Sequence, residues 1–145
     1  MLIEFRTSLD PELGVLATAA QRELADAGLR AGSRIFEPHD DAEHLVGVVH
    51  GRAVACATWR PLGPGEAEVR RIYVRPAFRG RGLARQLIVA VEEEALAVDR
   101  PVLRLELESG QPAAIALFQS SGYRPVRSAA PDRVTFVKQL PALVQ

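Results

Sequence analysis

The stretch IYVRPAFRGRGLAR at residues 72–85 decides the fold of this chain. Apolar residues between positions 69 and 74 are typical of a buried strand, and Pro76 ends it before two glycines. A helix from about Gly82 to Val98 is predicted by an apolar stripe at helical spacing: Leu83, Leu87, Ile88, Val91 and Ala95. The stretch therefore predicts a strand that runs through a glycine-rich turn into a long helix.

The turn has the features of an anion site. Gly80 and Gly82 let backbone amides approach a bulky ligand, and the first N–H groups of a helix have no partner within it. Arg79, Arg81 and Arg85 crowd this helix N-terminus, where the macrodipole disfavours each cation by about 0.3–1 kcal/mol. A bound anion would reverse that penalty, since arginine matches phosphate oxygens. We predict a phosphorylated ligand; the alternative is a solvated arginine cluster.

Two other phosphate motifs fit less well. A P-loop needs Gly-Lys-Ser/Thr, which is absent. A dinucleotide fingerprint needs a small residue where this chain has Arg85, although Glu106 lies at about the right distance for a ribose contact. The β-meander that precedes the turn also differs from the repeated βαβ halves of that fold.

The rest of the chain supplies the other elements of a sheet protein. Strands are predicted at 3–5, 45–49, 53–60, 102–107, 123–126 and 134–140, and helices at 11–28 and 112–121. Asp10 is the expected N-cap of the first helix, and His50-Gly51 the expected hairpin turn. This order predicts one α/β (α+β) domain over residues 1–145, with a mixed, mostly antiparallel central sheet flanked by helices.

Composition narrows the function classes. The 145 residues carry 18 basic and 18 acidic side chains, so no net charge favours nucleic acid. The single cysteine, Cys56, is expected to be a buried thiol, and His39, His44 and His50 lack metal-ligand spacing, so no metal is expected. Neither a signal-peptide layout nor an apolar run of about 20 residues is present, which predicts a cytoplasmic protein without a membrane segment.

Two segments together resemble the GCN5-related N-acetyltransferase (GNAT) superfamily. Its signature Arg/Gln-x-x-Gly-x-Gly/Ala, which follows Val-x-Pro, is matched by RGRGLA at 79–84 after VRP at 74–76. Its second signature, Asn-x-x-Ala-x-x-Leu-Tyr followed by Gly-Phe/Tyr, is similar to QPAAIALF at 111–118 and Gly122-Tyr123. The resemblance covers the whole chain in element order and is sharp from about 68 to 123. It implies the acyl-CoA N-acyltransferase fold.

The resemblance implies acetyl-CoA as co-substrate. The pantetheine arm would pair like an extra strand with residues 72–74, where that strand splays from 102–107, and the amides of 80–85 would hold the pyrophosphate. Gln111 replaces the usual asparagine. The implied cofactor-binding residues are Ile72, Tyr73, Val74, Arg79, Gly80, Arg81, Gly82, Leu83, Ala84, Arg85, Gln111 and Phe118.

Acetyl transfer to an amine requires a base and a donor for the carbonyl oxygen, and the family's expected donor is the Val74 N–H. Glu106 is the first choice of base, because it matches a glutamate of some members and partial burial in the cleft would raise its pKa. The alternative is a solvent-facing carboxylate. Glu68 is the second choice, with an ion pair to Arg70 or Arg71 as its alternative, and Glu108 is a distant third.

The proton donor is the main departure from the family pattern. Many relatives have tyrosine where this chain has Phe118, which cannot donate a proton and is expected to pack. Tyr123 is expected to be structural. The thiolate then leaves unassisted or takes a proton from water. The acidic segment 40–43, flanked by His39 and His44, lies in a region where relatives build the acceptor pocket. A pocket lined by these carboxylates would suit a cationic amine; the alternative is that the segment is a solvated loop.

Three functions follow from these expectations. The leading one is an N-acetyltransferase acting on a small amine or on a peptide or protein. The second is a CoA-binding module without catalysis, for which Phe118 is the motivating residue. A ribosome- or tRNA-directed enzyme is disfavoured by the zero net charge. Family members often dimerise, which leaves a homodimer open.

Overall fold

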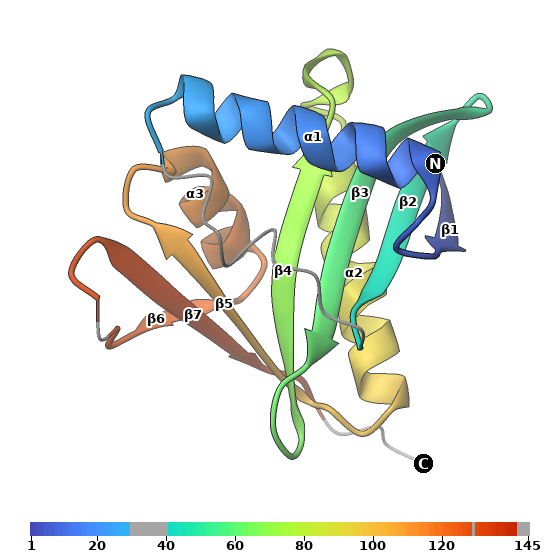
Figure 1. Cartoon of the computed structure of the whole chain (residues 1–145). Coiled ribbons are helices and arrows are strands. Elements are labelled where there is room, and N and C mark those ends of the chain that lie inside the picture. Colours follow the sequence, from blue (N-terminus) through green and yellow to red (C-terminus); the bar gives the residue numbers. More distant parts are fainter. Residues whose placement is uncertain (30–40, 129, 142–145) are drawn as a thin grey trace.

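The computed structural model describes residues 1–29, 41–128 and 130–141. In this part of the chain seven strands form one sheet in the order β1-β2-β3-β4-β5-β7-β6 (Figure 1). The strands are β1 (Leu2–Arg6), β2 (Glu43–Val49), β3 (Arg52–Pro61), β4 (Glu66–Val74), β5 (Val102–Glu108), β6 (Arg124–Val126) and β7 (Arg133–Gln139). The α-helices are α1 (Pro11–Asp26), α2 (Leu83–Ala97) and α3 (Pro112–Ser120), and a 3₁₀ turn spans Pro76–Phe78. The predicted mixed fold is confirmed.

One pair of strands is parallel. Every neighbouring pair in the sheet is antiparallel except β4 and β5, whose ladder joins residues 66–68 only to residues 102–104. Beyond these three pairs β4 and β5 diverge, as Figure 1 shows; α1 crosses above the opening, and α3 stands beside the end of β5. The sheet is therefore split along its middle.

The two faces of the sheet have separate apolar cores. Residues that alternate along β2, β3 and β4 point to opposite faces, as the period of two in a strand requires. Val46, Cys56 and Tyr73 pack beneath Leu13 and Leu16 of α1. The opposite face packs against α2 and α3, with a core that includes Leu45, Val54, Val74, Leu87, Val91, Phe118 and Phe136. One face of the strand that ends in the glycine turn is thus held by α1 and the other by α2.

Local sequence signals fix the ends of these elements. Asp10 caps α1, because its carboxylate accepts the Leu13 N–H at 2.9 Å, and Gly28 follows the helix with a φ of 74°. His50 and Gly51 turn between β2 and β3 with φ values of 49° and 76°. Both predictions are confirmed. Position 40 of the acidic segment and the flanking position 39 lie outside the described residues.

Cys56 is fully buried in β3, as predicted. Burial raises the pKa of its thiol to about 11, and Arg71 opposes only part of that shift. The group is therefore a neutral thiol near pH 7. No helix among the described residues is long and apolar enough to cross a membrane.

A buried polar cluster ties α2 to the C-terminal hairpin. The Tyr123 hydroxyl donates to Glu92 Oε2 at 2.8 Å, and Lys138 Nζ lies 2.9 Å from the same oxygen. The Lys138 ammonium also lies 5.5 Å from the centre of the Tyr123 ring. Burial, with Glu92 beside it, raises the pKa of Tyr123 above its ordinary value. The charge of Glu92 is thus balanced inside the fold.

Replacing Tyr123 by phenylalanine tests this cluster. Tyr123→Phe keeps the ring but removes a hydrogen bond to a buried carboxylate, so we expect the free energy of unfolding to fall by about 1.5–3 kcal/mol. Denaturant unfolding measures it, with Val89→Ala on the exposed face of α2 as a control that changes stability by under about 0.5 kcal/mol. Equal stabilities of Tyr123→Phe and the unaltered chain would contradict this account.

Candidate active site

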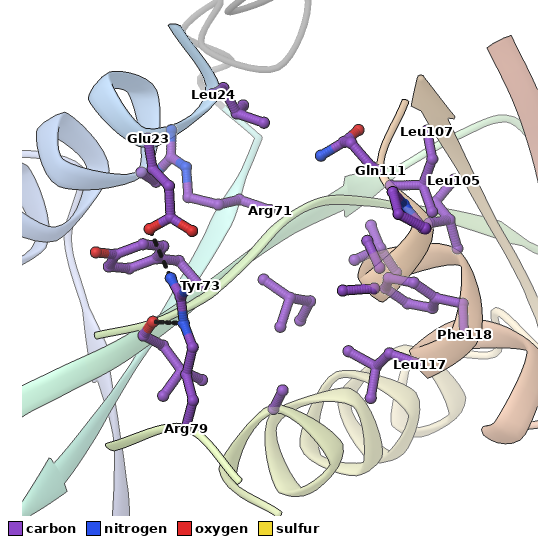
Figure 2. A pocket seen from close by; sticks show the side chains of 18 of the residues that line it. Glu23, Leu24, Arg71, Tyr73, Arg79, Leu105, Leu107, Gln111, Leu117 and Phe118 are labelled. Atoms are coloured by element: carbon purple, nitrogen blue, oxygen red, sulfur yellow. Dashed lines mark hydrogen bonds and ion pairs between the residues drawn. The ribbon is translucent and has the colours of Figure 1, made fainter. Parts of the chain in front are cut away.

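The opening between β4 and β5 holds a cavity of about 740 Å³. Its walls come from α1, β4, the glycine turn, the first turn of α2, β5 and α3. Figure 2 shows the polar side chains Glu23, Arg71, Tyr73 and Arg79 on one side of it, with mainly apolar residues of β5 and α3 across from them. Eleven of the twelve predicted cofactor residues line the cavity: Ile72, Tyr73, Val74, Arg79, Gly80, Gly82, Leu83, Ala84, Arg85, Gln111 and Phe118.

The end of β4 offers a backbone edge to this cavity. The Arg75 N–H donates to the Val54 carbonyl at 2.8 Å, and successive residues of an antiparallel pair alternate between bonding to the partner and pointing away from it. The Val74 N–H therefore points away from β3, toward the side where β5 has diverged. The Val74 carbonyl accepts a bond from Arg79 Nε at 2.9 Å (Figure 2). An extended ligand in the opening meets donors of an unpaired strand edge.

The glycine turn forms one end of the cavity. Gly80 and Gly82 have φ values of 77° and 76°, which a residue with a side chain rarely adopts. Gly82 is the N-cap of α2, and no described side chain caps this helix. The amides of its first turn are consequently left to water or to a ligand, and the helix dipole favours an anion there.

The three arginines of the turn have protein partners. Arg79 Nη2 lies 2.6 Å from Glu23 Oε2 of α1, and Arg85 donates to Ser120 Oγ at 2.8 Å. Arg81 lies over the Phe78 ring, 5.2 Å from its centre, and is not among the described residues that line the cavity. Arg79 and Arg85 thus line the cavity beside the glycine turn but already have protein partners, and Arg81 is not part of the described lining. The uncapped amides of the turn, more than the arginines, remain available to an anion.

The opposite wall comes from α3 and β5. Gln111 Oε1 accepts the Glu108 N–H at 3.1 Å, which fixes the side chain at the start of α3. Phe118 is 3% exposed and meets Tyr123 edge-on, with ring centres 5.2 Å apart. It gives the cavity a rigid apolar surface and no proton donor.

Glu106 lines the cavity from β5. Its side chain is 38% exposed, and its carboxylate lies 3.3 Å from Arg133 Nη1. As predicted, it occupies the face of β5 opposite to Leu105 and Leu107, which pack against the core. The structure thus brings this carboxylate to the opening, within reach of water.

Glu68 lies in an ion-pair cluster on β4. Its Oε1 accepts from Arg70 Nη1 at 2.7 Å and from Arg60 Nε at 3.1 Å. Burial alone would raise the pKa of Glu68, but the bonds from Arg70 and Arg60 outweigh it and hold the pKa below its usual range. Glu68 is absent from the described lining of the cavity. Its contacts match the alternative expectation, in which Glu68 forms an ion pair.

Tyr73 carries the only hydroxyl among the described residues that line the cavity. Burial, and then the charge of Glu23, raise its pKa, while Arg79 and Arg75 oppose the shift. The Tyr123 hydroxyl is bonded to Glu92 in the core instead. Tyr73 is thus the side-chain hydroxyl that a bound molecule meets.

Two groups of site residues were missed at the sequence level. Glu23 belongs to a helix whose pattern predicted only an apolar stripe, and its contact with Arg79 spans 56 residues. Arg70 and Arg71 were considered only as partners of Glu68, yet both line the cavity. For Glu23, the available signal in the sequence was the presence of a charged residue in helix α1.

No metal centre is visible in the described part of the chain, where no group of three or more His, Cys, Asp or Glu side chains could hold an ion. His44 Nδ1 is 3.0 Å from Thr58 Oγ1. Burial, with the charge of Arg71 beside it, lowers the pKa of His44. This histidine is therefore neutral near pH 7 and engaged within the sheet.

Comparison with known proteins identifies the family to which this chain belongs. The model of the Acetyltransferase (GNAT) family matches residues 13–123. An IAA acetyltransferase of Azospirillum brasilense is 29% identical over 97% of this chain and 90% of its own length. An L-methionine sulfoximine/L-methionine sulfone acetyltransferase of Pseudomonas paraeruginosa is 33% identical over 68% of this chain and 55% of its own length.

A solved structure shows the same fold with a ligand. A GNAT family acetyltransferase of Elizabethkingia anophelis with acetyl-CoA bound has a TM-score of 0.73 and 17% identity, covering 96% of this chain and 97% of that one. At that identity the likeness shows the fold alone, and the family model shows the family. The chain belongs to the GNAT family of acetyltransferases.

A pair of glycine substitutions tests the backbone of the turn. Gly82→Ala places a side chain at a positive φ, so we expect a loss of about 1–2 kcal/mol in the free energy of unfolding. Gly14→Ala, within α1 and with nothing within 4 Å of the added Cβ, is expected to add about 0.5–1 kcal/mol. Thermal and denaturant unfolding compare the two variants. A shift of the same sign in both would contradict the assigned turn.

Proposed function

We propose that this chain is an acetyl-CoA-dependent N-acetyltransferase that acetylates a primary amine of a small molecule or a peptide. The observation that carries the proposal is the split between β4 and β5, which combines an unpaired strand edge with an uncapped helix N-terminus in one cavity. Acetyl-CoA joins an extended, amide-containing arm to a pyrophosphate. The arm complements the unpaired strand edge, and the pyrophosphate complements the uncapped helix N-terminus.

The cofactor's position follows from these groups. The pyrophosphate would accept hydrogen bonds from the amides of residues 80–85, and the pantetheine arm would run along the edge of residues 72–74. Phe118 and Leu117 of α3 would pack against the arm from the other side. The exposed pair of Arg79 with Glu23 contributes little stability, so Arg79 can exchange its partner for a phosphate at small cost.

The reaction requires few protein groups. The neutral amine nitrogen attacks the thioester carbon, the carbonyl oxygen takes up negative charge and accepts the Val74 N–H, and the C–S bond then breaks. Glu106 accepts the proton of the amine through water, since its carboxylate lines the opening. The thiolate leaves with the electron pair of the C–S bond and takes its proton from water. Phe118 takes no part in proton transfer.

Of the two kinds of acceptor, a small molecule is favoured over a peptide. The relatives named above carry small molecules in their names, and those names support the same class here. A CoA-binding module without catalysis is the second candidate, because the described lining of the cavity has no hydroxyl at the position of Phe118.

Acetyl-CoA binding tests both candidates. At a concentration about 100 times its dissociation constant, the ligand is expected to stabilise the fold by about 2.7 kcal/mol, or roughly 8 °C in Tm. Thermal unfolding with and without acetyl-CoA measures this shift, with adenosine as a control that lacks the pyrophosphate and the arm. No shift at millimolar acetyl-CoA would refute the proposed function.

Removing the proposed base tests the chemistry. Glu106→Gln keeps the shape but cannot accept a proton, so kcat/KM is expected to fall about 100- to 10,000-fold. Thiol release with a good acceptor measures it, and Glu93→Gln on the exposed face of α2 is the control. If Glu68→Gln abolished turnover while Glu106→Gln did not, the base would be Glu68.

A further inference from the structure

The end of α1 folds back onto the helix. Gly28 follows the helix with a φ of 74°, and its N–H donates to the Ala25 carbonyl at 3.0 Å. The next N–H, that of Leu29, donates to the Leu24 carbonyl at 3.0 Å. These two bonds define a Schellman motif, in which the residue after the glycine commonly packs against a residue of the last helical turn. Leu24 and Leu29 both line the cavity and are only partly buried, so this apolar surface of α1 is open to a bound molecule.

Leu29 also reaches the loop between β5 and α3. A Cβ on Gly110 of that loop would lie 2.8 Å from Leu29 Cδ2, so the present position of the leucine depends on a glycine there. Gly110 lines the cavity as well, and the end of α1 therefore meets the β5–α3 loop at the cavity wall. Figure 2 shows Leu24 and Gln111 on one side of the cavity, with Arg79 of the glycine turn on the opposite side. Leu24 and the start of α3 thus lie away from the anion end.

The walls beside this contact are mainly apolar. The lining residues here are Leu24, Ala27 and Leu29 of α1, with Gly110, Pro112 and Ala113 before and within α3. Two polar side chains lie among them along the chain, and each has a protein partner. Glu23 lies 2.6 Å from Arg79 Nη2, and Gln111 Oε1 accepts a backbone N–H at 3.1 Å. The apolar residues together form a slot, the apolar slot, in which a bound molecule meets mainly hydrocarbon.

α1 and the anion site lie on opposite faces of the sheet. α1 packs on one face and α2 on the other, and the uncapped amides belong to the first turn of α2. A cofactor whose pyrophosphate binds those amides would reach the opening from the α2 face, and a molecule that packs against α1 in the apolar slot would reach it from the α1 face. Glu106 points to the α1 face, because Leu105 and Leu107 on either side of it pack in the core on the α2 face. An acceptor in the apolar slot would thus meet both the thioester and the proposed base.

Resting on the proposed function, we infer that the acceptor is a primary amine with an apolar hydrocarbon group, which packs between Leu24 and Leu29 of α1 and the start of α3. Leu24 and Leu29 are then residues that determine specificity. The hydrocarbon group contributes binding free energy in proportion to the apolar area that it removes from water. An amine with a second charge at its far end would bring that charge against hydrocarbon walls, which is unfavourable.

An alkylamine series tests the inference. Methylamine, propylamine and hexylamine share an amine pKa close to that of lysine, about 10, so a difference in rate within the series does not come from amine basicity. Thiol release from acetyl-CoA gives kcat/KM, which is expected to rise about fourfold for each added methylene. The diamine of the same length as hexylamine carries a second ammonium and is expected to react about tenfold more slowly than hexylamine, or slower still. A flat series, or a diamine that matches hexylamine, would overturn the inference.

Variants of the two leucines locate the effect. Leu29→Ala and Leu24→Ala each remove part of the α1 wall, so each is expected to lower kcat/KM for hexylamine by about tenfold and to change that for methylamine by less than about twofold. Val15→Ala, on the exposed side of α1 and outside the described lining of the cavity, is the control and should keep the full rise along the series. Circular dichroism checks folding, and if one leucine variant does not fold, the other gives the result. An unchanged preference for hexylamine in a folded leucine variant would overturn the assignment of the slot.

A binding measurement separates this inference from the proposed function. Isothermal titration of CoA-loaded protein should show that N-hexylacetamide binds at least about tenfold more tightly than N-methylacetamide, and that Leu29→Ala loses most of this difference. Acetyl-CoA should raise Tm equally in both proteins. If acetyl-CoA binds but hexylamine does not react and its acetylated product binds no more tightly than the methyl compound, the inference is overturned and the proposed function stands. Failure of acetyl-CoA to raise Tm would refute the proposed function itself.

Discussion

The short ladder between β4 and β5 is the constraint on which the site depends. A parallel pair that continued past residues 68 and 104 would have used the edge of β4 within the sheet and closed the cavity. Because the pairing stops, the backbone at Ile72 and Val74 keeps hydrogen-bonding capacity inside the molecule, where unmet groups are unfavourable. An extended ligand in the opening could therefore hydrogen-bond to this strand edge.

The two helices on either face keep that opening in place. α2 packs against β3 and β4 from one face through Leu87 and Val91, and α1 packs against the same strands from the other through Leu13 and Leu16. With both faces of β4 anchored, divergence from β5 does not loosen the strand. The Glu23–Arg79 pair then connects α1 to the glycine turn, so the helix farthest away in sequence contributes to that end of the cavity.

The sequence predicted what depends on local chemistry. Short local motifs predict the Asp10 cap, the His50-Gly51 turn and the glycine turn, and the structure confirms each. What it did not predict depends on register. The bulge at Arg70, which has no opposite residue in β3, shifts the facing of every later residue of β4, and a shift by one residue has no signature in an apolar pattern. For the same reason the cavity position of Arg70 could not be predicted from the sequence, whereas that of Glu23 depends on a contact with a residue 56 positions away.

The absence of a hydroxyl at Phe118 bears less on catalysis than it first suggests. A thiol has a pKa near 8.5, so a thiolate is a stable leaving group near neutral pH and gains little from an acid. An alkylammonium has a pKa near 10 and cannot attack until it has lost a proton. Under the proposed function the demanding proton transfer is thus at the acceptor, for which Glu106 would be the base, and the demanding charge is on the carbonyl oxygen, for which the Val74 N–H would be the donor. If Glu106 and the Val74 N–H have these roles, a site with an apolar ring at Phe118 lacks only the proton donor, which is the group that the reaction needs least.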